Sequence, residues 1–239
     1  MKKILLSALL LVVALPMLAQ LNVQFHYDFA DALYGKELSN RAHWTATIEN
    51  FKADKWGSTY FFVDADFGGN TMKSVYGEIS RELRFWEAPI AMHVEYNGGL
   101  SGFGSYNDAY LAGGAWNWAN KDFSKTFSLQ LLYKYLANQP SSNKHSWQIT
   151  TVWGIHFANG LCTFSGYADL WHDNSVQGNL ILSSEPQFWV NLYALDSVDD
   201  DFKLSLGGEL ELSKGLVWPA KGTNNKFYAI PTLAAKWTF

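Results

Sequence analysis

Charged and hydrogen-bonding side chains recur at every second position in several short segments of this chain. The segment 21–29 shows the pattern most clearly, with Asn22, Gln24, His26 and Asp28 alternating with Leu21, Val23, Phe25, Tyr27 and Phe29. A period of two places alternate side chains on opposite faces of a β-strand. Polar groups collected on one face could bind a solute, line an aqueous passage or, in the right combination, catalyse a reaction.

Carboxylates dominate the charged groups at these positions. Lysines, which usually dominate the solvated face of a soluble β-sheet, are scarce in mid-strand. In a confined space of low dielectric constant, such an excess of negative charge attracts cations and neutral polar solutes and repels anions. We therefore predict a hydrated inner face that meets a small polar solute. Its candidate residues are Asp28, Glu49, Tyr60, Asp64, Asp66, Glu78, Arg81, Glu95, Tyr167, Asp169, Glu185, Trp189 and Glu209.

Aromatic side chains accompany the carboxylates on the predicted inner face. They are Tyr60, Phe62, Tyr110, Trp116, Tyr167, Trp171 and Trp189. Aromatic planes beside carboxylates and amides could stack on a nucleobase or a sugar ring and orient it. The alternative is that these side chains only fill the interior of a small barrel.

Arg81 does not fit this division of faces, because alternation from Ile79 to Leu83 places it on the apolar side. An arginine in the middle of a lipid-facing band costs about 2–4 kcal/mol. Either a bulge that turns the side chain toward Glu78 or Glu82, or a position near an interface, would avoid that cost. We predict the bulge.

Catalysis would require a recognisable combination of side chains. Lipid-modifying barrels need a nucleophile, a histidine and a third residue that orients it. No Gly-x-Ser-x-Gly elbow joins the available groups, and no two histidines stand at i, i+2 as a metal site in a strand would need. We predict no enzymatic activity, metal or cofactor, although His26, His43, His93, His156, Ser80, Ser128, Ser165 and Ser205 are placed where they could act.

About twelve alternating segments of roughly ten residues follow one another along the chain, as in an even-numbered membrane barrel. The fold class predicted is all-β, a transmembrane antiparallel up-and-down β-barrel. The segments are 21–29, 42–52, 56–67, 74–86, 88–98, 107–118, 123–136, 146–158, 161–172, 179–192, 202–213 and 226–239.

The two ends of the sequence indicate where such a barrel would lie. The last segment carries an uncharged face from Phe227 to Trp237 and stops at Phe239, which is typical of bacterial outer-membrane barrels. Residues 1–19 combine two lysines, a short apolar run and Ala19, which predicts a cleaved signal peptide. The predicted domains are a signal peptide at 1–19 and an outer-membrane barrel at 20–239, located in the bacterial cell outer membrane.

Composition separates the remaining fold classes. A lipocalin-like barrel or a β-sandwich would show the same alternation with the apolar face inside. The chain has 16% aromatic residues and 11 Trp, however, which the aromatic girdles of a transmembrane barrel require and a soluble domain rarely does. A net charge of −4 supplies no basic stripe, so a nucleic acid polymer is not a predicted partner.

Connections of different length predict the orientation of the barrel. The turns at Glu87-Ala-Pro and Asn159-Gly are short, whereas 31–41, 98–107, 136–146 and 213–226 are longer. Outer-membrane barrels have short periplasmic turns and long outer loops. The two short turns and both chain ends are therefore expected on the periplasmic side.

Three segments resemble the nucleoside-specific channel-forming (Tsx-like) family of outer-membrane porins. The stretch Tyr76-Gly-Glu-Ile-Ser-Arg-Glu-Leu-Arg84 is similar to a strand of that family with a Glu-Ile pair and a following Arg, so Glu78 and Arg81 match its pattern. Residues 95–99 (Glu-Tyr-Asn-Gly-Gly) and 56–66 (Trp-Gly-Ser-Thr-Tyr-Phe-Phe-Val-Asp-Ala-Asp) follow the same order. The resemblance covers the first half of the mature chain, while the second half matches only in length and strand count. It implies a monomeric, twelve-stranded barrel with a narrow lumen that passes nucleosides.

The predicted function is passive, selective diffusion of small polar solutes, with nucleosides as the leading candidates and outer-membrane lipid as the surrounding partner. Two alternatives remain open. One is a structural or adhesion barrel without transport, and the other is a barrel enzyme acting on lipid.

Overall fold

A computed structural model describes residues 20–239 except 103, 107, 176–177, 200 and 223–224. The predicted signal peptide, 1–19, lies outside the described residues. No helix within the described residues has the length and the apolar character needed to cross a membrane.

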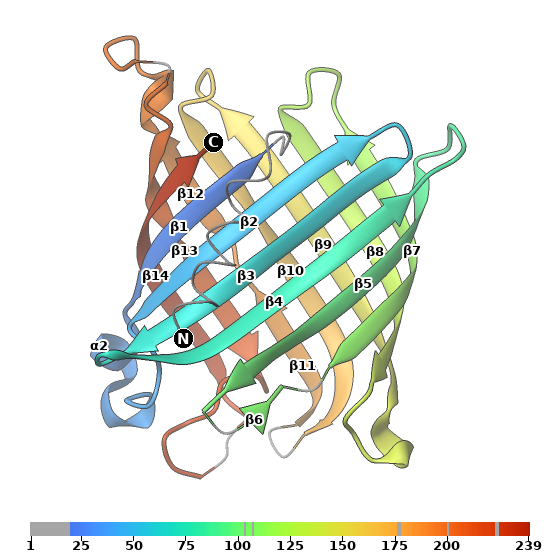
Figure 1. The fold of residues 1–239 in the computed structure, drawn as a ribbon, viewed down its shortest axis with the longest axis vertical. Coiled ribbons are helices and arrows are strands. Elements are labelled where there is room, and N and C mark those ends of the chain that lie inside the picture. The colour runs from blue at the N-terminus through green and yellow to red at the C-terminus, as the bar shows by residue number, and fades with distance from the viewer. Residues whose placement is uncertain (1–19, 103, 107, 176–177, 200, 223–224) are drawn as a thin grey trace, which may run out of the picture.

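Within the described residues, the sheet is a closed barrel of twelve antiparallel staves (Figure 1). A stave is here one full crossing of the barrel wall, formed by a single strand except where β11 and β12 together form one. Closure is complete because β1 pairs with both β14 and β2, and β10 pairs with both β9 and the stave made of β11 and β12. The strands are β1 (Leu21–Asp28), β2 (Trp44–Asp54), β3 (Gly57–Gly68), β4 (Thr71–Leu83), β5 (Ile90–Ser101), β7 (Ala109–Ala119), β8 (Lys125–Leu136), β9 (His145–Phe157), β10 (Cys162–Ser175), β11 (Gly178–Ser184), β12 (Gln187–Asn191), β13 (Leu204–Lys214) and β14 (Phe227–Thr238). Every predicted segment coincides with one stave, which confirms the predicted fold class.

The stave predicted at 179–192 is interrupted at Pro186, where β11 ends and β12 begins. Proline has no N–H to donate, so it cannot continue a ladder on both sides. Gly166 of β10 lies opposite with φ +153, and a Cβ atom there would come within 2.4 Å of the carbonyl oxygen of Glu185. The backbone of β10 therefore approaches the break too closely for a side chain at Gly166. On the other side of the break, the amide of Leu210 donates to the Pro186 carbonyl at 2.9 Å and joins β13 to this stave.

The outer face of the barrel is apolar and the inner face is polar. Phe25, Leu131 and Leu233 remain 58%, 60% and 64% exposed, although they sit in mid-strand, while Gln24 and His26 beside Phe25 are buried. A soluble barrel or sandwich has the reverse arrangement, so that alternative is wrong. The same alternation holds on β13, where Leu206 is exposed and Ser205 beside it is fully buried.

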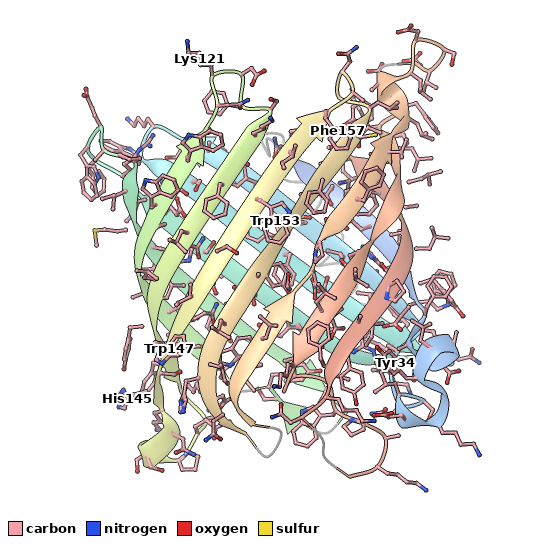
Figure 2. All side chains as sticks on the ribbon, turned by 180° about the vertical axis from the view of Figure 1, so that it is seen from behind. Tyr34, Lys121, His145, Trp147, Trp153 and Phe157 are labelled. Carbon is pink, nitrogen blue, oxygen red and sulfur yellow. The ribbon has the colours of Figure 1, made fainter. Side chains whose placement is uncertain are left out.

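Aromatic side chains mark both edges of the apolar outer face. On β9, Trp147 lies near one end of the barrel and Phe157 near the other, with Trp153 between them (Figure 2). The height from Trp147 to Phe157, along a strand tilted by about 40°, is roughly 25 Å, which is the height of the apolar band in transmembrane barrels.

The two rims differ in their connections. One rim, here called the terminus end, carries Phe239 and the turns at 84–89 and 158–161. The opposite rim, the loop end, carries most of the longer connections, including the segment between β1 and β2 with α2 (Ala30–Tyr34) and η1 (Gly35–Glu37). Three smaller elements complete the chain: β6 (Gly104–Ser105), η2 (Ser141–Asn143) and η3 (Leu192–Ala194).

The predicted bulge at Arg81 is wrong. Arg81 pairs in unbroken register with Thr59 on β3 and Val94 on β5, so its side chain lies on the outer face. Its guanidinium donates two hydrogen bonds to Asp54, at 2.7 and 2.9 Å, at the terminus end of β2. Arg81 thus avoids the cost of lipid by lying at the rim beside a carboxylate, and it is not a residue of the lumen.

Tyr110 and Trp116 were predicted on the inner face and lie instead on the outer face. Tyr110 pairs with Tyr96, and Leu111 beside it pairs with the inward-facing Glu95. The inner face of β7 is thereby lined by small and apolar side chains such as Leu111 and Ala115, both buried.

We expect the tolerance of the outer face to charge to depend on depth. Leu131 lies midway along β8, whereas Leu206 lies near the start of β13, next to the pair of Leu204 and Trp237. Leu131→Arg should lower the free energy of unfolding by about 2–4 kcal/mol, and Leu206→Arg by about 0–1 kcal/mol. Urea unfolding from lipid vesicles, followed by tryptophan fluorescence, measures both. Equal losses at the two positions would contradict the assigned membrane depth.

Candidate functional site

The barrel lumen gathers nearly all of the polar residues singled out from the sequence. Twelve of the thirteen predicted site residues lie on inner faces, and Arg81 is the exception. Most of these inward side chains are only half-buried, so solvent reaches them along the interior. Trp189 and Asp28 are buried, because neighbouring side chains fill the lumen around them.

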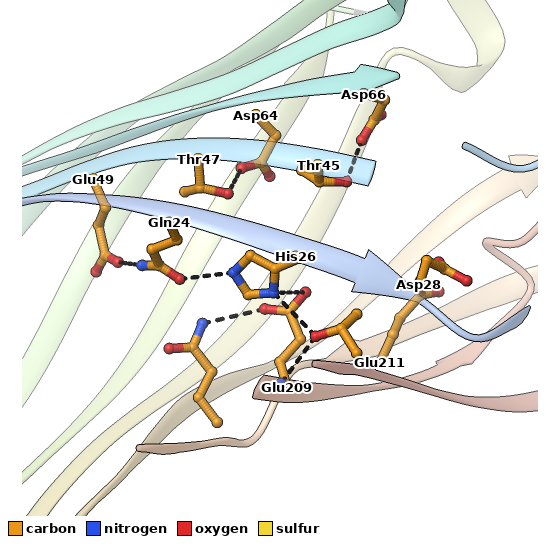
Figure 3. Close-up of polar contacts among 12 residues, drawn as sticks. Gln24, His26, Asp28, Thr45, Thr47, Glu49, Asp64, Asp66, Glu209 and Glu211 are labelled. Carbon is orange, nitrogen blue, oxygen red and sulfur yellow. Dashed lines mark hydrogen bonds and ion pairs between the residues drawn. The ribbon is translucent and has the colours of Figure 1, made fainter. Parts of the chain in front are cut away.

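A chain of polar contacts runs along β1 and its neighbours (Figure 3). Gln24 donates to Glu49 at 2.7 Å and contacts the His26 ring through its amide oxygen at 2.9 Å. His26 also lies 3.5 Å from Glu209. Glu209 in turn accepts a hydrogen bond from Gln187 at 3.3 Å. Each carboxylate on this wall is thus held in one orientation by an amide or an imidazole from a neighbouring stave.

Two aspartates on β3 are anchored by hydroxyl groups. Thr47 donates to Asp64 at 2.6 Å, and Thr45 donates to Asp66 at 2.7 Å (Figure 3). Ser74 of β4 donates to the second oxygen of Asp66 at 2.6 Å. Both carboxylates are thus oriented by neutral hydroxyl donors rather than by a cation.

Two lysines inside the barrel lie over tryptophan rings. The Lys236 ammonium is 4.1 Å from the centroid of Trp189, and the Lys134 ammonium is 4.3 Å from that of Trp171. Lys134 also donates to Gln148 at 2.7 Å. Cation–π contact and an amide acceptor stabilise each charge away from bulk water. Because lumen carboxylates outnumber these two cations, the interior remains acidic.

His93 links two carboxylates on β4 and β5. Its ring nitrogens lie 3.0 Å from Glu95 and 3.6 Å from Glu82, and Asn117 donates to Glu82 at 2.6 Å. Pairing of staves brings these groups together, since Glu82 and His93 are opposite one another in the register.

Arg41 was not singled out from the sequence, and it is the main cation at the loop end of the lumen. It pairs with Asp28 at 2.9 Å and with Glu211 of β13 at 2.8 Å. Burial alone would lower the pKa of Arg41, but the Glu211 and Asp28 carboxylates raise that pKa above its ordinary value, so the guanidinium stays charged. Arg41 lies in a segment predicted only as a loop, and no local pattern reveals that its side chain turns back into the barrel.

The segment around Arg41 is folded against the wall rather than extended into solvent. Leu38 and Ala30 are fully buried in a cluster with Tyr228 and Ile230 of β14. The Tyr228 hydroxyl donates to Glu37 at 2.8 Å. An apolar core at one side of the mouth thus fixes the segment between β1 and β2 against the loop end of β14.

The histidines of the lumen are not paired with serines in the described part of the chain. His26 contacts Gln24 and Thr232, and His156 contacts Thr163 at 3.0 Å. Both hydroxyl partners are threonines, and the second ring nitrogen of His26 contacts the Gln24 amide rather than a carboxylate. Among the described residues, no group of three or more His, Cys, Asp or Glu side chains is arranged to hold a metal ion.

Comparison with known proteins gives a family and a fold. The family described as a domain of unknown function (DUF5020) matches residues 19–239. None of the curated proteins compared with the chain matches it.

One solved structure of a porin, NanC, superposes with a TM-score of 0.56 and 12% sequence identity, over 92% of this chain and 100% of that chain. A mutant of the Rh. blastica porin superposes with a TM-score of 0.35 and 10% identity, over 86% of this chain and 58% of that chain. At 12% identity the likeness to NanC shows a shared barrel fold. The resemblance to nucleoside-specific channels stays a prediction.

Arg41 should stabilise the loop end measurably. Arg41→Gln removes the partner of two carboxylates that are 10% and 13% exposed, and we expect it to lower the free energy of unfolding by about 1–3 kcal/mol. Lys226→Gln is the matched control, because Lys226 is 60% exposed and pairs with Glu37 in solvent. Urea unfolding in vesicles compares the two. An unchanged midpoint for Arg41→Gln would show that the two ion pairs contribute no stability.

Proposed function

The chain belongs to the DUF5020 family, and we propose that it is an outer-membrane channel through which small polar solutes diffuse passively, with cations and neutral solutes preferred over anions. The observation that carries this proposal is the half-buried, carboxylate-lined lumen inside an apolar outer surface. The barrel presents Phe25, Leu131 and Leu233 to its surroundings and keeps solvent-accessible charges inside. That arrangement is typical of a lumen that water and solutes enter.

The acidic lumen favours cations for an electrostatic reason. Asp64 and Asp66 are held by neutral hydroxyl donors, and no ion pair with a lysine or arginine is formed by either among the described residues. Low-dielectric walls concentrate the resulting negative potential within the passage. Anions would meet a barrier along the same path.

Nucleosides are the leading solutes in this proposal, and a row of rings supports them. Tyr60, Phe62, Tyr76 and Tyr106 follow one another with centroids 6.2, 6.1 and 6.0 Å apart. The first three rings lie on the inner faces of β3 and β4, beside Asp64 and other lumen carboxylates. Weak stacking on these rings, with hydrogen bonds to the carboxylates, would raise occupancy while release stays fast.

A structural barrel and a lipid-modifying enzyme are the competing functions. The first would need no acidic lumen. The second would need a nucleophile, a base and a group that orients the base, and the second ring nitrogen of His26 contacts the Gln24 amide rather than a carboxylate. A barrel that conducts no ions in a planar bilayer, or that cleaves or acylates lipid, would favour one of them over a channel.

Neutralising Asp64 and Asp66 together should reduce cation preference. We expect Asp64→Asn/Asp66→Asn to lower the K⁺ to Cl⁻ permeability ratio by about twofold or more, measured as the reversal potential under a salt gradient. Asp122→Asn is the control, because Asp122 lies in the turn between β7 and β8, outside the lumen. An unchanged reversal potential in the double variant would show that these two carboxylates do not line the conducting path.

Nucleosides should interrupt the ion current if they enter the lumen. We expect millimolar adenosine to block the single-channel current, and Tyr60→Ala/Phe62→Ala to weaken the block by about tenfold. Ion conduction that adenosine leaves unchanged would support a general cation-preferring porin and reject nucleoside selectivity.

A further inference from the structure

A band of carboxylates from opposite walls meets inside the barrel. Glu78 of β4 interacts electrostatically with Glu95 of β5 and with Asp169 of β10. β4 and β10 are separated in the sheet by β5, β7, β8 and β9, so Glu78 and Asp169 face each other across the lumen. Within the described residues, Lys134 shares this band and His93 lies 3.0 Å from Glu95, so two basic side chains face four carboxylates, since Asp173 also interacts with Lys134.

Two amide oxygens and one carboxylate oxygen of the same band have no hydrogen-bond partner in the described part of the barrel. Among the described residues, the side-chain oxygens Asn97 Oδ1, Gln130 Oε1 and Asp169 Oδ1 are buried and accept no hydrogen bond. Asn97 is 5% exposed and pairs in register with Glu78, while Gln130 is 7% exposed and adjoins Asp169 through Thr150. A buried acceptor is stabilised by a hydrogen-bond donor, so a solute that fits this band should carry donors.

Lys134 and Lys236 show which donor this lumen accommodates. Each places a primary ammonium over a tryptophan ring, and Lys134 also donates to the amide oxygen of Gln148. An ammonium carries three donors, no acceptor and a positive charge. A hydroxyl group would satisfy one acceptor but leave the excess negative charge uncompensated.

We propose that Glu78, Glu95 and Asp169, with the unpaired oxygens of Asn97 and Gln130, form a binding site for the primary ammonium group of a small organic solute. This inference rests on the proposed function in that the solute enters through the lumen. It narrows the solute class, because an amine-bearing solute is held where a neutral analogue of the same shape is not.

Three sugars of one ring type test the site. Glucosamine carries an ammonium, glucose a hydroxyl and N-acetylglucosamine a neutral amide at the same carbon. We expect glucosamine to block the single-channel current at a concentration about tenfold lower than either analogue. Equal block by all three would assign recognition to the ring and overturn the ammonium site.

Variants separate a discrete site from general attraction by the acidic lumen. Asp169→Asn should raise the half-blocking concentration of glucosamine by about tenfold, and Gln130→Leu, which changes no charge, by about threefold or more. Asp66→Asn is the matched control, because both Asp66 oxygens already accept hydroxyl hydrogen bonds. Equal effects of Asp169→Asn and Asp66→Asn, with none from Gln130→Leu, would show diffuse electrostatics and reject the site.

Calorimetric titration of glucosamine into the detergent-solubilised barrel separates this inference from the proposed channel. Each variant is first shown to be folded by its retained β-sheet circular dichroism. Saturable binding that Asp169→Asn weakens, in a barrel that conducts no ions, would support the site and reject the channel. Ion conduction without glucosamine binding or block would reject the site and leave the channel standing.

Discussion

Every structural feature of this protein depends on the closure of its sheet. A strand surrounded by lipid cannot leave backbone N–H and C=O groups unpaired, because no water is present to replace the lost hydrogen bonds. Pairing of β1 with β14 removes both edges at once and fixes the register of the first and last staves, from Asn22 opposite Thr238 to Asp28 opposite Thr232. That register decides which side chain of each strand faces inward.

Closure also explains why the lumen is acidic and yet stable. Inward carboxylates come from several staves, and each is oriented by a donor on its neighbour, as Gln24 orients Glu49 and Thr47 orients Asp64. Fixed carboxylates in a partly hydrated interior are less costly than carboxylates in a dry core, because solvent and neutral donors share their solvation. The exception is the loop end, where Asp28 and Glu211 are more deeply buried and share the positive charge of the Arg41 guanidinium.

The inner wall is not uniform, and this bears on where a solute could pass. Leu111 and Leu132 fill the interior beside β7 and β8, and Trp189 fills it beside β12. Glu49, Asp64 and Glu78 on β2, β3 and β4 remain half-buried. Side-chain packing therefore leaves the acidic, aromatic-rich wall accessible to solvent, and the proposed passage runs along it.

Alternation along the sequence predicts the number of staves and most of their inner faces, because a period of two is a local property of each strand. Where one face of a strand carries charges, the inner face is easily assigned, as for Glu209 and Glu211, which alternate with Leu210 and Leu212. The inner face could not be assigned in this way for β7, because neither of its faces carries a charge, and the sequence prediction placed Tyr110 inward. The pairing of Leu111 with the inward-facing Glu95 shows that Leu111, and not Tyr110, faces inward.

Contacts between distant segments were decided by the tertiary structure alone. Alternation placed Arg81 outward, and the predicted bulge failed because Asp54, on another strand, supplies a partner at the rim. Arg41 gave no local signal, because its partners Asp28 and Glu211 are brought together by the closure of β1 onto β14 and β13. The band of Glu78, Glu95 and Asp169 arises in the same way, since opposite walls of a barrel meet only when the sheet closes. Alternation along a strand is therefore written in the sequence, whereas proximity across the lumen depends on register and closure.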